Sequence, residues 1–186
     1  MSISRWQASQ FARIIRAGGV ISYPTEAVFG LGCDPLNPEA VNRILDLKAR
    51  PVTKGLILIA SDFWQLKPYL QQLPDAIETK ILASWPGPTT WLVPALENVP
   101  YWLRGVHKSL AVRISDHPTV IELCRASGSA LVSTSANPGG LPPARTSLAV
   151  RRYFHGTLDA MVAGSTGGQQ RPSVIRDALT DKQIRV

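Results

Sequence analysis

The chain has 186 residues and very few of the side chains that form metal centres or disulfides. Its two cysteines, Cys33 and Cys124, have no CxxC or similar ligand spacing, and its three histidines are scattered. A cysteine without such spacing is most often a small buried hydrophobic residue. We therefore expect both cysteines in the core, and neither a disulfide nor a metal ion held by the protein.

Long apolar segments are also missing. The longest purely aliphatic run, Leu56 to Ala60, is far shorter than the roughly 20 residues that a membrane-spanning helix needs. The N-terminus has no basic segment followed by an apolar core and a small-residue cleavage site. We therefore expect a cytoplasmic protein with no membrane partner.

The common motifs of nucleotide binding and covalent catalysis are absent too. The sequence contains neither a GxxxxGK[ST] phosphate loop nor a GxGxxG motif that opens a helix. We find no credible catalytic triad and no paired carboxylates. If the protein binds a nucleotide, it must do so with scattered hydroxyls and cations, and any catalysis should be non-covalent.

The composition is that of an ordinary globular protein, with 45% hydrophobic and 18% charged residues. Positive charge is in excess, because 20 Lys and Arg residues face 13 Asp and Glu residues, a net charge of +7. The excess is larger in residues 94–186 (11 basic, 6 acidic) than in residues 1–93 (9 basic, 7 acidic). An anionic partner is one interpretation, and a basic protein that binds nothing anionic is the other.

Apolar segments of strand length alternate with helical patterns along the chain. We expect strands near residues 20–23, 56–59, 91–93, 110–114, 130–132, 160–162 and 173–175. We expect helices after Ser4, after Asn37-Pro38, over 61–70, over 75–85, from His117-Pro118 through Leu123, and over 147–154. This alternation predicts a single α/β domain over residues 1–186, with a twisted mixed sheet flanked by helices and no second domain.

The clearest candidate site follows the predicted strand at 130–132. Ser133, Ser135 and Asn137 alternate, so in an extended segment their side chains point to one side. Hydroxyls and an amide can bind phosphate, carboxylate or ribose groups, and ligands of open α/β sheets usually lie beyond the carboxyl ends of strands. A turn-rich loop without function is the alternative, because Ser, Asn, Pro and Gly are common turn residues.

Several cations are placed where an anion could meet them. Pro51 ends the second helix and pushes Arg50 out of the helical conformation, which allows Lys48 and Arg50 to converge on one anion. Lys54 precedes the next strand, and Arg113 stands alone in an apolar strand, where it needs a carboxylate from this protein or from a ligand. Glu26 follows an earlier strand, and its role stays open.

Five segments, in this order and spacing, are similar to the motifs of one family. They are Tyr23-Pro24-Thr25-Glu26 with Gly30-Leu31-Gly32, Lys48-Ala49-Arg50, Pro86-Gly87-Pro88-Thr89-Thr90, Ala111-Val112-Arg113, and Ser133-Thr134-Ser135-Ala136-Asn137. The chain resembles the YrdC-like family, in its short bacterial form without a C-terminal extension domain, over roughly residues 10–186. The resemblance implies a twisted α/β sheet with a concave basic face.

The resemblance also implies an activity and a site. Members of the family combine L-threonine, bicarbonate and ATP into threonylcarbamoyl-adenylate with release of pyrophosphate, and magnesium is carried by ATP. Carried over position by position, the threonine site contains Thr25, Arg113, Ser133 and Ser173. The ATP site contains Lys48, Arg50, Lys54, Ser109, Ser135, Asn137 and Arg185.

Three positions depart from the family pattern. Ala27 stands where threonine is frequent, Ser173-Val174 replaces a frequent Ser-Thr pair, and Ile59 stands where longer relatives have a threonine-contacting histidine.

The resemblance also implies a use for the product, which would supply the modification of adenosine 37 in tRNAs that read ANN codons, together with the TsaB, TsaD and TsaE proteins. The basic face could also bind tRNA or double-stranded RNA.

Two other classes of function remain open at this point. An RNA-binding module without turnover would explain the positive charge, but it leaves the hydroxyls of Thr25, Ser133 and Ser135 unexplained. A carbamoyl-transferring domain, similar to the YrdC-like part of the hydrogenase maturation protein HypF, would use the same pocket for a carbamoyl-adenylate. That larger protein carries further domains.

Overall fold

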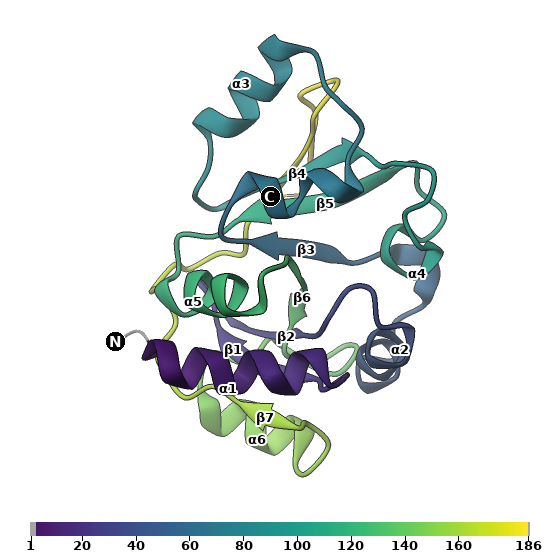
Figure 1. The fold of residues 1–186 in the computed structure, drawn as a ribbon. Helices are drawn as coiled ribbons and strands as arrows, with labels where there is room; N and C mark the ends of the chain where they lie inside the picture. Colours follow the sequence, from purple (N-terminus) through teal and green to yellow (C-terminus); the bar gives the residue numbers. More distant parts are fainter. Residues whose placement is uncertain (1–2, 186) are drawn as a thin grey trace.

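The computed structural model describes residues 3–185, which form one α/β unit around a nine-stranded sheet (Figure 1). The strand order is β7-β1-β2-β6-β3-β5-β4-β8-β9. The strands are β1 (Ile21–Pro24), β2 (Phe29–Gly32), β3 (Ile57–Ala60), β4 (Thr89–Pro94), β5 (Ser109–Ile114), β6 (Leu131–Ser135), β7 (Ala160–Met161), β8 (Val174–Asp177) and β9 (Gln183–Arg185). The predicted fold class, a mixed sheet flanked by helices, is confirmed.

Six α-helices accompany the sheet, and the sequence signals at several of their ends are used as expected. The helices are α1 (Arg5–Arg16), α2 (Pro38–Leu47), α3 (Asp75–Ala83), α4 (Tyr101–Arg104), α5 (Pro118–Ser127) and α6 (Ser147–Phe154). Ser4 caps α1 in a capping box with Gln7. The Asn37 side chain caps α2 by accepting a hydrogen bond from the Ala40 backbone N–H, and Pro38 occupies the first turn.

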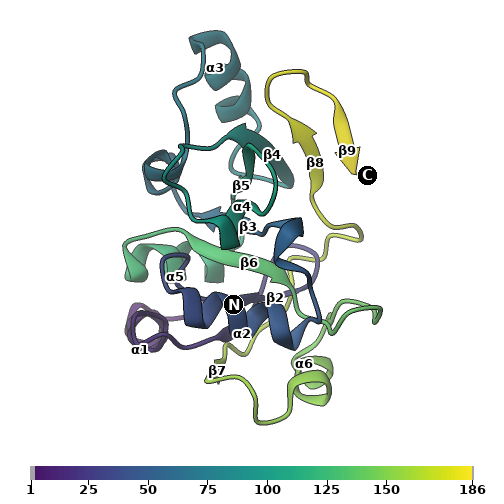
Figure 2. The ribbon, with the colours of Figure 1, turned by 90° about the vertical axis from the view of Figure 1, so that its right-hand side faces the viewer.

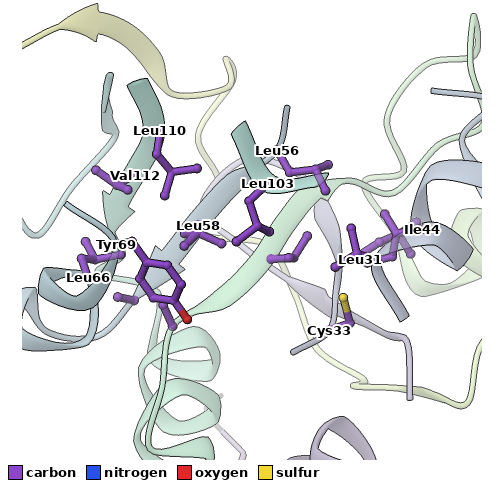
Figure 3. Close-up of a cluster of buried hydrophobic side chains, with 14 of the residues drawn as sticks. Leu31, Cys33, Ile44, Leu56, Leu58, Leu66, Tyr69, Leu103, Leu110 and Val112 are labelled. Carbon is purple, nitrogen blue, oxygen red and sulfur yellow. The ribbon is translucent and has the colours of Figure 1, made fainter. Parts of the chain in front are cut away.

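The hydrophobic core has two parts. The larger cluster includes Leu58, Leu110 and Val112 of the sheet, and these pack with Leu66, Tyr69 and Leu103 (Figure 3). The smaller cluster joins α1 and α5 to Ile21 and Tyr23 of β1, Ile59 of β3 and Leu131 of β6. Helices α1 and α5 lie side by side in Figure 1, whereas the β8–β9 hairpin lies on the side of the molecule away from α1 (Figure 2).

The extent of β6 differs from the expectation on which the candidate site was based. The strand runs from Leu131 to Ser135, beyond the predicted 130–132, and pairs antiparallel with both β2 and β3. Its polar residues therefore belong to the strand itself and do not follow the carboxyl end of a parallel strand. The alternation of Ser133 and Ser135 along an extended segment is confirmed.

One predicted helix, over residues 61–70, is wrong. The segment forms two short 3-10 turns, Phe63–Gln65 and Lys67–Tyr69, because Pro68 cannot continue an α-helix. The side chains of Trp64 and of Leu82 in α3 are 59% and 38% exposed, so neither belongs to the core. The predicted helix over 75–85 ends at Ala83.

Other short elements were not predicted. Strands β2 and β9 and helix α4 each have only three or four residues, too few to show a period in the sequence. Cys33 and Cys124 are free and buried, as expected. No helix within residues 3–185 is long and apolar enough to cross a membrane, and the cytoplasmic location stays a prediction.

Candidate active site

A cavity of about 430 Å³ lies against the central strands β5 and β6. Ser109, Ala111 and Arg113 are alternate residues of β5, and all three line the cavity. Leu110 and Val112, between them, point into the larger hydrophobic cluster. The period of two along the strand therefore gives β5 one face for the core and one for a ligand.

The cavity lining has a strong excess of positive charge. It includes Arg50, Lys54, Arg104 and Arg113, together with the imidazole of His107. No Asp or Glu residue is among the described residues that line it. A ligand with several negative charges is the natural complement of such a surface. Of the two interpretations of the positive net charge, the cavity lining favours an anionic partner.

Arg104 and His107 are cavity residues that the sequence did not indicate. Arg104 is the last residue of α4, and His107 lies in the connection from α4 to β5, where Gly105 has φ of +62°. A Cβ atom at Gly105 would lie 2.2 Å from the Thr53 carbonyl oxygen, so only glycine lets this connection pack so closely against residues 52–54. The Gly105 conformation could not be recognised in a sequence that has 14 glycines.

Arg50 is brought to the cavity by a sharp turn of the backbone after α2. Ala49 has φ of +47°, and Arg50 precedes Pro51, so the chain turns sharply away from the helix axis. The Arg50 guanidinium donates from Nε (3.2 Å) and Nη2 (2.8 Å) to the Gly55 carbonyl oxygen. The contact fixes its orientation beside Lys54, and a planar guanidinium held in this way suits bidentate binding of a phosphate.

Lys48 does not line the cavity, although the sequence groups it with Arg50. Its buried ammonium donates to the Ser135 carbonyl oxygen at 2.5 Å, the Asn137 carbonyl oxygen at 2.9 Å and Asn137 Oδ1 at 3.3 Å. An ammonium has three N–H donors, so these three oxygens account for all of them. Burial, and then the charge of Arg50, lower the pKa of Lys48 to about 8.

The segment that Lys48 contacts is held by a small hydrogen-bond network. The Ser135 hydroxyl donates to Asn137 Oδ1 at 2.6 Å, and Asn137 Nδ2 donates to the carbonyl oxygens of Pro138 and Leu141. Ser133 and Ser135 line the cavity, whereas Asn137 does not. The Asn137 amide therefore orders the end of β6 within this structure.

Arg113 is paired with a carboxylate of the protein. Its Nη1 lies 2.9 Å from Oε2 of Glu26, and both side chains are at most 10% exposed. Burial alone would raise the pKa of Glu26, but the charge of Arg113 and a hydrogen bond from Ser115 keep it below its usual value. The Glu26 carboxylate is therefore ionised at neutral pH. Arg113 still lines the cavity, so this pair does not remove it from the site.

The other predicted residues are placed as follows. Thr25 and Ser173 line the cavity and are buried, with the Thr25 hydroxyl donating to the Val28 carbonyl oxygen and the Ser173 hydroxyl 2.8 Å from that of Thr90. Ser109 lines it from the start of β5. Arg185 lies in β9, and its side chain is outside what the structure describes; the neighbouring Ile184 lines the cavity.

The comparisons with known proteins identify the family. Residues 13–186 match the model of the Sua5/YciO/YrdC family, which carries the description "Telomere recombination". The chain belongs to this family. A Pseudomonas aeruginosa protein named threonylcarbamoyl-AMP synthase is 56% identical over 183 residues, 98% of each chain. One from Nitrosococcus oceani with the same name is 53% identical over 185 residues, 100% of each chain.

Solved structures agree with the fold. Sua5 of P. abyssi, complexed with L-threonine, is 31% identical with a TM-score of 0.89 over 95% of this chain. The present chain spans about half of that longer protein, 52% of its length. YciO of E. coli has a TM-score of 0.85 at 23% identity and covers 100% of this chain and 95% of its own, a likeness in fold alone.

Proposed function

We propose that this protein is a threonylcarbamoyl-AMP synthase, which converts L-threonine, bicarbonate and ATP into threonylcarbamoyl-AMP and pyrophosphate. The observation that carries the proposal is the full-length identity above 50% to proteins of that name. The cavity supports it, because a site for ATP and an amino acid needs both a cationic wall and a small set of hydroxyls.

The phosphates of ATP bind along the wall formed by Arg50 and Lys54. Ser109 and Ser135 lie on the sheet side of the same cavity and supply neutral donors, and Arg185 in β9 is retained as a further ATP contact. Lys48 and Asn137 belong to the ATP site through their effect on Ser135. They shape the end of β6, and the ammonium of Lys48 has no donor left for a phosphate.

Threonine binds at the part of the cavity that contains Arg113 and the buried hydroxyls. The guanidinium of Arg113 pairs with the threonine carboxylate, because a second carboxylate can use donors that Glu26 leaves open. Thr25, Ser133 and Ser173 surround the amine and the hydroxyl of the amino acid. Hydroxyl side chains can donate and accept, which suits both of these groups.

Catalysis proceeds without a covalent bond between the protein and a substrate. The threonine amine captures carbon dioxide with loss of a proton, or bicarbonate with loss of water, to give a carbamate. A carbamate oxygen then attacks the α-phosphorus of ATP as pyrophosphate leaves. The protein holds the reactants together and neutralises phosphate charge. Within residues 3–185, no group of three His, Cys, Asp or Glu side chains is placed to hold a metal ion. A magnesium ion would therefore be carried by the phosphates, where it neutralises part of their charge.

Incubation of the purified protein with ATP, magnesium and labelled bicarbonate, with and without L-threonine, tests the function. We expect threonine-dependent release of pyrophosphate and a labelled adenylate in equal amounts. Binding of RNA without any turnover would favour the RNA-binding module instead. Formation of a carbamoyl-adenylate that contains no threonine would favour a HypF-like activity; T. kodakarensis HypF, at 20% identity, shares the fold alone.

The product belongs, in this proposal, to the synthesis of threonylcarbamoyladenosine at position 37 of tRNAs that read ANN codons. TsaB, TsaD and TsaE would use it, and tRNA or double-stranded RNA would contact the basic face. Mixing the protein with those three proteins and an unmodified tRNA, and measuring the modified nucleoside by mass spectrometry, tests this link directly.

A further inference from the structure

Glu26 is a buried carboxylate next to the cavity, and it belongs to neither the proposed ATP site nor the proposed threonine site. Its side chain is 4% exposed, and it is outside the set of residues that line the cavity. Its Oε2 atom lies 2.9 Å from Nη1 of Arg113. A bound amino acid would reach Arg113 but not Glu26, so any effect of Glu26 on the ligand must pass through Arg113.

The carboxylate of Glu26 is fixed from several sides. Its Oε1 accepts a hydrogen bond of 2.5 Å from the Ser115 hydroxyl, which itself accepts from the His117 backbone N–H at 3.1 Å. The Glu26 carbonyl oxygen accepts from the Gln169 backbone N–H at 3.0 Å. A Cβ atom at Gly167 would lie 3.1 Å from the Glu26 Cα atom, so the 164–172 segment packs closely over this residue.

Arg113 takes its orientation from this fixed carboxylate. Within residues 3–185, the pair with Glu26 is its one ion pair, and it uses Nη1. The contact is an ion pair and not a hydrogen bond, because Glu26 Oε2 has no hydrogen-bond partner among the described residues. Charge attraction to the fixed carboxylate therefore holds one end of the planar guanidinium and leaves its N–H donors for a ligand. A long side chain that is held before the ligand arrives loses less conformational entropy on binding.

The charge balance also matters. Glu26 and Arg113 together are neutral, and a free amino acid such as threonine is a zwitterion with no net charge. Binding a neutral zwitterion beside a neutral buried pair adds no unbalanced charge to this part of the cavity.

We propose that Glu26 is a positioning residue for the amino acid, which orients Arg113 toward the threonine carboxylate without touching the substrate. The proposal rests on the proposed function and deepens its threonine site. It separates Glu26 from the ATP side, because the described contacts of its side chain do not include Arg50 or Lys54.

The test compares Glu26→Gln with the wild type in pyrophosphate release, with threonine and ATP titrated separately. Glutamine keeps the shape and can still accept from Ser115, but it removes the charge that holds Arg113. We expect the KM for threonine to rise by about tenfold to a hundredfold, the loss typical of a charge-assisted contact, and the KM for ATP to stay within about twofold. Glu122→Gln, which removes a surface carboxylate 3.9 Å from Arg125, is the matched control and should match the wild type.

Three outcomes would overturn the proposal. An unchanged KM for threonine would give Glu26 no role in binding, and a lowered KM would make it a competitor for Arg113. Equal increases in both KM values would show a general structural effect. If Glu26→Gln does not fold, as judged by circular dichroism, Glu26→Asp is measured by the same criteria. A wild type without threonine-dependent turnover would instead refute the proposed function.

Discussion

Replacing Lys48 by methionine tests whether this lysine shapes the site or binds phosphate. Methionine has a similar length and no charge, so the Ser135 carbonyl oxygen, the Asn137 carbonyl oxygen and Asn137 Oδ1 each lose one hydrogen bond. Asn137 Oδ1 still accepts from the Ser135 hydroxyl, and the Ser135 carbonyl oxygen still accepts from the Asn137 backbone N–H. Each charge-assisted hydrogen bond contributes about 1.5–3 kcal/mol, while removing a buried ammonium also removes a desolvation cost of several kcal/mol.

The lost hydrogen bonds outweigh the removed desolvation cost, so Lys48→Met should lower the free energy of unfolding by about 2–4 kcal/mol. For a chain of this length, that corresponds to a fall in Tm of about 5–15 °C. Urea unfolding and differential scanning calorimetry measure both quantities. Lys182→Met, at an exposed lysine without a described side-chain contact and outside the cavity lining, is the control and should change the free energy by less than about 0.5 kcal/mol.

The difference in the free energy of unfolding between the wild type and Lys48→Met should depend on pH, and the sign of this dependence is defined. The pKa of Lys48 is about 8 in the folded protein and near its ordinary 10.5 in the unfolded chain. Between these values the unfolded chain binds more protons, so the stability of the wild type relative to Lys48→Met should rise as pH increases from about 8 to 10.5. One outcome would refute this reasoning: Lys48→Met keeps the full stability of the wild type but loses as much ATP affinity as an Arg50 variant. Lys48 would then be a phosphate ligand.

Three further predictions concern ligands and mechanism. Arg50→Ala should weaken ATP binding by about 1.5–3 kcal/mol, and an unchanged affinity in titration calorimetry of the folded variant would contradict this. Serine should be used poorly and 2-aminobutyrate worse still, because a site that hydrogen-bonds a hydroxyl rejects an analogue without it; equal turnover of threonine and 2-aminobutyrate would contradict that pocket. Substituting Ser133 or Ser135 singly should reduce kcat by a moderate factor without abolishing it, and a threonyl, carbamoyl or adenylyl adduct found by intact-mass spectrometry would overturn the non-covalent mechanism.

The sequence alone determined the fold class, because long helices and buried strands carry periodic patterns that survive any tertiary context. Asn37-Pro38 began α2, Pro51 followed its end, and the apolar run at 110–114 became β5. The motif order also identified the family, which the match over residues 13–186 confirms. Within the site, the alternation of Ser133 and Ser135 was enough to place both on one side of β6.

Tertiary structure alone decided which partner each charged residue has. Lys48 and Arg50 are two residues apart, yet one contacts the end of β6 and the other contacts Gly55. Arg113 met a carboxylate 87 residues earlier in the chain, and Arg104 entered the cavity through a backbone contact that requires Gly105. A local pattern records which face of an element is apolar, whereas an ion pair depends on where two distant elements meet, and that is fixed only when the core packs.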